Sequence, residues 1–266
     1  MISEIVITNY KSILYQRFTL ARINVFFGRS GCGKTNLLEA VGMAAAAHDG
    51  DSDTGGLLKR GIRVTKPSLT FHASIGKEKK KEIEIAWCER NGSKKAKLVC
   101  ESRDDQVAAW KDISWYDPAY IARVNDLIDY ISNGSFDERY PFADKTKNMV
   151  LNAAFRGSRN FRDYQIFNAL TEDQIVELLM DSTPPAFFAM DNIETLLTPE
   201  ICSNVINNIT PLAARQNKQV LITTSQPAII RGMNLDDPLQ KLFLMEKTEN
   251  GQTTLKEMTD IPLIFQ

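Results

Sequence analysis

The first fifty residues have the hydrophobic pattern of three strands followed by a helix. Apolar and polar residues alternate over residues 3–8 and 15–20, as in strands with one buried face. Residues 23–27 form a short apolar run, which is typical of a central strand buried on both faces. The segment 34–47 combines strong helix formers with an apolar stripe. We therefore expect strand, strand, strand, loop and helix in this order.

The middle of the chain has a different pattern. Alternation over residues 68–75, 82–87 and 95–102 predicts antiparallel strands, with Asn91-Gly92 as a hairpin turn. Residues 104–183 are expected to be mainly helical, with a short strand-like segment at 113–116. They contain no long heptad run, so we expect no coiled-coil arm.

Strand and helix patterns return in the last third of the chain. Strands are predicted at 186–190, 219–224, 241–247 and 253–258, and a helix at Pro199–Arg215. This predicts an α/β fold with a mostly parallel central sheet, an antiparallel β insertion and a helical lobe. We expect one domain, in which residues 1–66 and 184–266 form the α/β core, 67–103 the antiparallel region and 104–183 the helical lobe.

Composition narrows the class of protein. Of 266 residues, 32 are Lys or Arg and 33 are Asp or Glu, so net charge favours neither nucleic acid nor a membrane surface. The chain has no long apolar stretch and no signal-peptide pattern at its start. Its four cysteines lack CxxC spacing and it has only two histidines, which argues against a zinc site. We expect reduced thiols, a cytoplasmic location and no membrane partner.

The strongest motif lies between the predicted strand 23–27 and the helix that follows. "GRSGCGKT" at 28–35 matches the P-loop pattern G-x-x-x-x-G-K-[S/T]. In such a loop backbone N–H groups surround a phosphate, the lysine (Lys34) contacts the β- and γ-phosphates, and Thr35 binds Mg²⁺. The motif predicts that the α/β fold is of the P-loop NTPase type, that residues 1–66 and 184–266 form a nucleotide-binding core, and that ATP and Mg²⁺ are bound. The expected nucleotide contacts are Gly28, Ser30, Gly31, Cys32, Gly33, Lys34, Thr35 and Asn36.

A second acidic residue is needed to complete a magnesium site. The apolar run 186–190 places Asp191 at a strand end, where its carboxylate is predicted to hold the metal together with Thr35. Lys34 and Asp191 are farther apart in the chain than in ring-forming hexameric ATPases. The chain lacks the Asn-Lys-x-Asp motif of a GTPase, and a P-loop small-molecule kinase stays as a weaker alternative.

Four segments resemble the ATPase heads of the ABC superfamily, in the branch of RecF-like, SMC-like and OLD-nuclease-like proteins. These segments are "ITNYKS" (7–12), "INVFFGRSGCGKTNLLEA" (23–40), "FFAMDNIETLLTPE" (187–200) and "QVLITTSQPAI" (219–229). The resemblance implies that ATP is held between two heads, and hence a homo-oligomer. It also implies that Lys11 approaches the phosphates, although a solvated lysine after a strand is the competing interpretation.

The chain departs from this family at three positions. Asn192 stands where the family has the glutamate that polarises water, and an amide cannot accept the proton. Ser225 replaces a histidine expected near the γ-phosphate, and Asp173 replaces a glycine in the signature segment, best matched at 170–174. We therefore expect weak or absent hydrolysis. Glu194 and Gln226 are candidate substitutes in catalysis: the first is a nearby carboxylate, and the second would orient water.

The resemblance and these departures lead to one functional expectation with two alternatives. The first is an ATP-binding subunit that acts as a nucleotide-gated sensor or scaffold for a separate nuclease or toxin-like effector, in bacterial antiviral defence or DNA maintenance. The alternatives are an active, DNA-associated ATPase, with DNA as a partner, and the small-molecule kinase.

Overall fold

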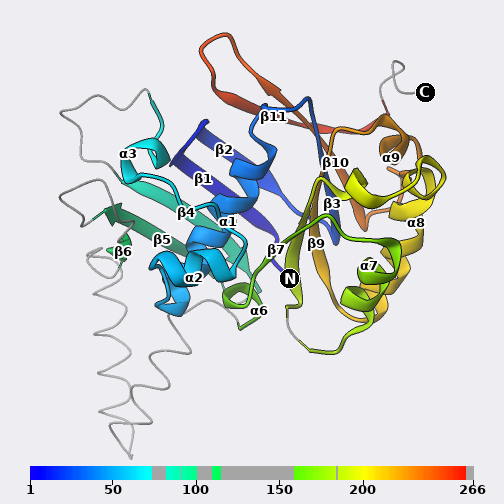
Figure 1. Cartoon of the computed structure of the whole chain (residues 1–266), viewed down its shortest axis with the longest axis horizontal. Coiled ribbons are helices and arrows are strands. Elements are labelled where there is room, and N and C mark those ends of the chain that lie inside the picture. The colour runs from blue at the N-terminus through cyan, green and yellow to red at the C-terminus, as the bar shows by residue number, and fades with distance from the viewer. Residues whose placement is uncertain (74–81, 91, 101–109, 115–158, 184, 262–266) are drawn as a thin grey trace, which may run out of the picture.

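The protein contains two β-sheets, and a computed structural model describes residues 1–73, 82–90, 92–100, 110–114, 159–183 and 185–261 (Figure 1). One sheet is mostly parallel and the other is antiparallel. A long helix, α1 (Lys34–Asp49), lies between them, and further helices cover the outer face of the parallel sheet.

The parallel sheet carries the strands that end at the candidate site. Its order is β11-β10-β3-β9-β8-β7, with β11 antiparallel at one edge. All residues of the three central strands are buried, which explains their unbroken apolar runs. Their bounds are β3 Ile23–Phe27, β7 Ile166–Asn168, β8 Phe187–Asp191, β9 Gln219–Thr224, β10 Gln240–Lys247 and β11 Thr253–Met258.

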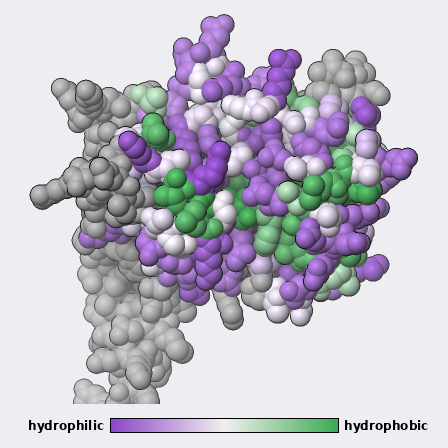
Figure 2. Space-filling model, in the orientation of Figure 1, coloured by the Kyte–Doolittle hydropathy of each residue, from purple (hydrophilic) through white to green (hydrophobic). Residues whose placement is uncertain are grey.

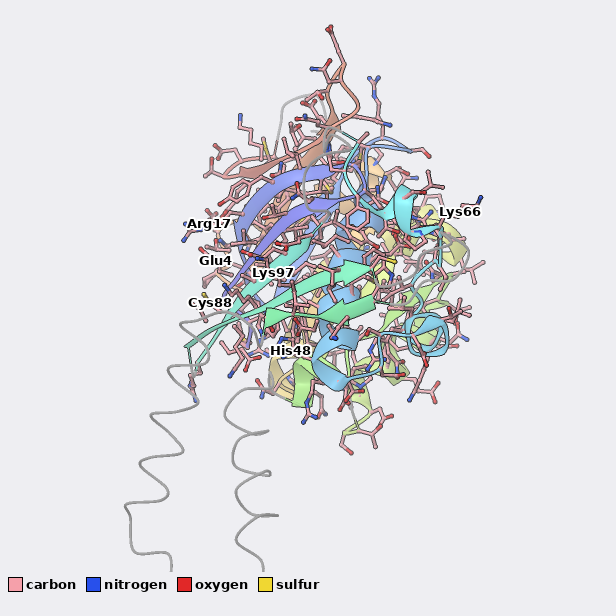
Figure 3. All side chains as sticks on the ribbon, turned by 90° about the vertical axis from the view of Figure 1, so that its left-hand side faces the viewer. Glu4, Arg17, His48, Lys66, Cys88 and Lys97 are labelled. Atoms are coloured by element: carbon pink, nitrogen blue, oxygen red, sulfur yellow. The ribbon has the colours of Figure 1, made fainter. Side chains whose placement is uncertain are left out.

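The antiparallel sheet has the order β2-β1-β4-β5-β6. In Figure 3 this sheet faces the viewer, and α1 lies behind it. The β4–β5 hairpin places Glu89 opposite Gly92, next to the predicted Asn91-Gly92 turn. The bounds are β1 Glu4–Tyr10, β2 Ile13–Thr19, β4 Ile83–Glu89, β5 Gly92–Cys100 and β6 Trp110–Asp112.

Helix α1 is buried on nearly all sides because sheets pack against it from two directions. Its small residues 44–46 are fully buried and let both sheets approach closely. A second hydrophobic cluster fills the space between the parallel sheet and the outer helices. These helices are α7 (Glu172–Met180), α8 (Pro199–Arg215) and α9 (Pro227–Arg231).

The predicted fold class is confirmed: the chain is an α/β protein with a P-loop between the central strand and a buried helix. The helix at Pro199–Arg215 has the predicted bounds, with Thr198 as its N-cap. A hairpin joins β10 and β11, which pair antiparallel, and Gly251 in its turn has a positive φ of 77°.

The prediction of a strand over 68–75 is wrong for its first residues. Residues Pro67–Thr70 form a single helical turn, α3, because proline suits the first position of a helix. Phe71 then makes one isolated antiparallel bridge with Tyr10. Residues 74 and 75 lie outside the described part of the chain.

The division of the chain between the two sheets differs from the expected one. Strands β1 and β2, assigned to the nucleotide-binding core, pair with each other and with β4 in the antiparallel sheet. The region expected to be helical contains β7, which joins the parallel sheet beside β8, and β6, which precedes the strand expected at 113–116. Most of the predicted helical lobe, and the absence of a coiled-coil arm, fall within residues 115–158, outside those described.

The surface mixes polar and hydrophobic residues. Figure 2 shows a hydrophobic area on the side where α7 and its neighbours lie, and Val176, Met180 and Leu196 are among the exposed apolar side chains. Within the described residues, no helix has the length and hydrophobicity needed to cross a membrane. Two further short helices complete the described structure, α2 (Thr54–Lys59) and α6 (Arg159–Arg162).

Candidate nucleotide-binding site

The P-loop lies at the carboxyl end of β3, where the chain turns into α1. Gly31 and Gly33 have positive φ angles of 80° and 106°, which glycine adopts without strain. Gly33 also has no room for a side chain, because a Cβ there would collide with the hydroxyl of Thr253 and approach that of Ser12. Thr253 in turn donates a hydrogen bond of 2.7 Å to the carbonyl of Cys32. The β1–β2 turn and β11 therefore fix the conformation of the loop.

The side chain of Lys34 folds back onto the P-loop. Its Nζ donates to the carbonyl oxygens of Gly28 at 2.7 Å and Arg29 at 3.2 Å. The ammonium group is thus held at the centre of the loop, where the motif requires a cation for phosphate.

Asp191 and Thr35 meet although 156 residues separate them in the chain. Thr35 Oγ1 donates to Asp191 Oδ2 at 2.7 Å, because β8 and β3 are parallel and separated only by β9. A hydroxyl and a carboxylate this close suit Mg²⁺, which prefers oxygen ligands and takes only a few from protein. Among the described residues, no group of three or more His, Cys, Asp or Glu side chains could hold a metal ion.

Thr223, on β9, is part of this site and was not predicted. Its hydroxyl donates a short hydrogen bond to Asp191 Oδ1 and accepts one of 2.8 Å from the backbone N–H of Asn192. It therefore fixes both the carboxylate and the turn that follows it. The only sequence signal was its place at the end of a buried strand, which does not reveal what it contacts.

Asn192 follows β8 in the left-handed conformation, with φ 51° and ψ 58°. Asparagine is among the few residues with a side chain that adopt this region readily. Asn192 is one of the residues that line the cleft in front of the P-loop, at the position where the family resemblance leads us to expect a carboxylate.

Glu194 is close to this position but is engaged elsewhere. Its Oε1 accepts hydrogen bonds from the N–H of Ser225 at 2.9 Å and the hydroxyl of Ser225 at 2.8 Å. Its Oε2 is buried without a hydrogen-bond partner. Gln226 caps α9, and its backbone N–H donates to Thr224 Oγ1 at 3.0 Å. Ser225, which stands in place of the expected histidine, lines the cleft in front of the P-loop. The two candidate substitutes in catalysis, Glu194 and Gln226, are not among the residues that line it.

The P-loop, Asn192 and Ser225 surround an open cleft of about 380 Å³, within the usual range for small-molecule sites. The cleft is lined by Ser30, Gly31, Gly33, Lys34, Thr35, Asn36, Arg63, Asn192 and Ser225. Arg63 is the residue here that sequence reasoning missed, since an arginine in a loop has no distinctive pattern.

Lys11 lies beside the cleft and pairs with Glu39. Its Nζ donates to Glu39 Oε2 at 2.6 Å, and Arg63 Nε donates to Glu39 Oε1 at 2.7 Å. Burial raises the pKa of Glu39, but Arg63 and Lys11 outweigh it and hold that pKa below its ordinary value. Burial lowers the pKa of Lys11, and Glu39 opposes this change. The contact of Lys11 with phosphate stays a prediction.

The signature-like segment 170–174 forms the start of α7. Thr171 caps the helix and exchanges hydrogen bonds with Gln174 in a capping box. Asp173 lies in the exposed first turn, where a negative charge stabilises the helix dipole. This gives a structural reason for an acidic residue at that position.

Comparisons with known proteins agree with this geometry. A family model described as an AAA domain matches residues 4–184, and no curated protein sequence matches the chain. The SMC head domain from Thermotoga maritima is 9% identical, with 98% of this chain and 99% of that chain covered and a TM-score of 0.48. The Smc head domain from Pyrococcus furiosus, with an extended coiled coil and bound to the C-terminal domain of ScpA, is 10% identical, with 97% and 96% covered and a TM-score of 0.50.

At this low identity, the second likeness establishes only the fold, which is that of an SMC head. The family match covers more than half of the chain, and the P-loop lies between β3 and α1 within it. The chain therefore belongs to the AAA domain family and is a P-loop ATPase with the fold of an SMC head.

Proposed function

We propose that this protein binds ATP and Mg²⁺ and hydrolyses ATP slowly or not at all, so that binding itself is the signal. Lys34 and the glycines of the P-loop would hold the phosphates, and Thr35 with Asp191 would hold the metal. Mg²⁺ held there would supply positive charge to offset that of the phosphates. The proposal places the chain in the branch of RecF-like, SMC-like and OLD-nuclease-like heads, with degenerate hydrolysis motifs.

The observation that carries the proposal is which side chains lie at, and next to, the position expected for the general base. Asn192 lines it with an amide, which cannot act as a general base. The nearest substitute, Glu194, has one oxygen bound to Ser225 and the other buried. A missing general base costs roughly 10²–10⁴ in rate. Binding depends on other residues, so it is expected to be retained.

Partners belong to the same proposal. An ATP holder without its own effector chemistry would act on a separate nuclease or toxin-like chain, in antiviral defence or DNA maintenance. Two heads would hold ATP between them as a homo-oligomer. The Pyrococcus furiosus head bound to a domain of ScpA is an example of a protein with this fold that binds a separate chain.

Titration calorimetry and phosphate release on the purified chain test this function. We expect binding of ATP with Mg²⁺, its loss in Lys34→Ala, and turnover below about 0.1 s⁻¹, far under ordinary enzyme rates. Lys59→Ala is a matched control, because Lys59 is an exposed lysine on α2, outside the residues that line the cleft. Faster turnover that Lys34→Ala abolishes would show that the chain is a working ATPase.

One observation favours the active, DNA-associated ATPase as the second candidate. Glu194 Oε2 is buried without a partner, which is costly for a carboxylate. A rearrangement that freed Glu194 from Ser225 would relieve this cost and supply a base near the cleft. Phosphate release that increases on addition of duplex DNA would support this candidate over the first.

A further inference from the structure

Glu39 is a buried carboxylate beside the cleft that touches neither the phosphate loop nor the metal pair. It lies on α1 one turn after Thr35, and its side chain is fully buried. Two cations from separate parts of the chain converge on it. Lys11 comes from the β1–β2 turn, and Arg63 from the loop between α2 and α3.

Arg63 is held by three of its donors. Its Nε and backbone N–H donate to Glu39 Oε1 at 2.7 and 3.1 Å, and its Nη2 lies 3.3 Å from Glu39 Oε2. Nη2 also lies 3.3 Å from Asn36 Oδ1. This side-on pairing fixes the plane of the guanidinium group. Among the described residues its Nη1 has no hydrogen-bond partner, so one edge remains for another anion.

Arg63 borders the phosphate cleft and also a second cleft on the side of Lys11 and Ser12. Arg63 is one of the lining residues, and its side chain is 61% exposed although its partner Glu39 is fully buried. The hydrogen bond to Glu39 raises the pKa of Arg63, and the charge of Asp191 adds to this rise. The guanidinium group thus lies within electrostatic reach of the metal-binding carboxylate.

The second cation explains how Glu39 can hold Arg63 without cancelling its charge. A lone Arg63–Glu39 pair would be neutral and would attract a polyanion only weakly. With Lys11 at 2.6 Å from Glu39, two cations share one anion and the cluster keeps one net positive charge. The side chain of Arg63 is 61% exposed and that of Lys11 only 11%, so this charge is exposed mainly at Arg63, which lines the cleft.

We infer that Glu39 is a positioning residue, which holds Arg63 so that its free edge contacts the phosphates of the nucleotide. This inference rests on the proposed function, because it concerns the same cleft. Lys11 contributes by neutralising Glu39 instead of touching the nucleotide. Sequence alone did not suggest either Glu39 or Arg63.

A double-mutant cycle on the full chain tests the inference. The dissociation constant for ATP with Mg²⁺ would be measured for Arg63→Gln, Glu39→Gln and the two together. We expect each single change to weaken binding about tenfold, as for the loss of one charge-assisted contact. Because both changes remove the same contact, the double variant should also be weaker by about tenfold. Glu4→Gln is the matched control and should bind normally, since it breaks an ion pair of 2.8 Å with Arg17 in the antiparallel sheet (Figure 3).

Three results would overturn the inference: a double variant about a hundredfold weaker, Glu39→Gln with unchanged affinity, or Glu39→Gln with tighter binding. If Glu39→Gln does not fold, Arg63→Lys decides, since it keeps the charge but loses the side-on pairing. It should bind as weakly as Arg63→Gln, and wild-type affinity would refute the positioning role. Failure of the proposed function is distinct, because then the unmodified chain would not bind ATP or Lys34→Ala would bind equally well.

Discussion

Restoring a carboxylate at position 192 should turn slow hydrolysis into measurable turnover. Asn192 lines the cleft, so a glutamate there would reach the space in which water attacks the γ-phosphate. A general base contributes roughly 10²–10⁴ to the rate of such a reaction. From the lower limit of this range, we expect Asn192→Glu to hydrolyse ATP about a hundredfold faster than the unmodified chain.

The same change should cost stability, and the backbone sets the amount. Residue 192 has φ 51° and ψ 58°, a conformation that asparagine tolerates and glutamate does not. Left-handed backbone costs about 1–2 kcal/mol for an ordinary residue. For a chain of this size this corresponds to a melting temperature lower by about 2–8 °C. The bond between the residue 192 N–H and Thr223 involves the backbone, so it should survive.

Asn192→Gln separates the chemical effect from the strain. It has the length of glutamate and the same left-handed backbone, but it carries an amide that cannot accept a proton. Phosphate release at saturating ATP and Mg²⁺ should be fast in the glutamate variant, slow in the glutamine variant and absent when Lys34→Ala is added. If both variants bind ATP and release phosphate equally slowly, the missing base is not what limits hydrolysis.

Three further predictions concern the P-loop and the stability of the fold. Gly33→Ala should prevent ATP binding and lower the free energy of unfolding by about 1–3 kcal/mol, because its Cβ would collide with Thr253 at a φ of 106°; calorimetry and thermal melting would show both, and normal binding would contradict the described loop. Gln219→Ala should cost about 2–4 kcal/mol, since this buried amide exchanges hydrogen bonds with both backbone groups of Ile2; urea unfolding measures it, and a loss below 1 kcal/mol would contradict it. Burial lowers the pKa of His48 below its ordinary 6.5, so the unfolded chain binds the proton more readily than the folded chain. The free energy of unfolding should therefore fall as pH drops through 6.5 toward the lower folded pKa. Urea unfolding of His48→Gln should show a weaker decline between about pH 7 and 5, and a decline identical to that of the unmodified chain would exclude His48 as its cause.

The sequence was sufficient where a feature depends on neighbouring residues. The glycine spacing of the P-loop sets the local backbone of residues 28–35, so the loop and the start of the helix at Lys34 were predicted, although the helix extends to Asp49, beyond the predicted end at 47. Asp191 was found because an apolar run indicates a buried strand, and the residue that follows the run lies at the carboxyl end of that strand.

The sequence did not determine which sheet a strand joins. Alternation in β1 and β2 shows that one face is buried, and two different sheets satisfy that condition equally well. The strand expected at 68–75 failed for a related reason, since Pro67 and a short apolar segment fit a helical turn as well as an extended edge.

Within the site, the sequence alone determined which groups we propose to bind phosphate and metal, because their motif is local and their chemistry strict. Only the tertiary structure decided what surrounds them. Thr223 contacts Asp191, Ser225 engages Glu194, and Glu39 gathers Lys11 and Arg63 from distant segments. Such contacts depend on the register of parallel strands and the packing of α1 between two sheets, so no short stretch of sequence contains them.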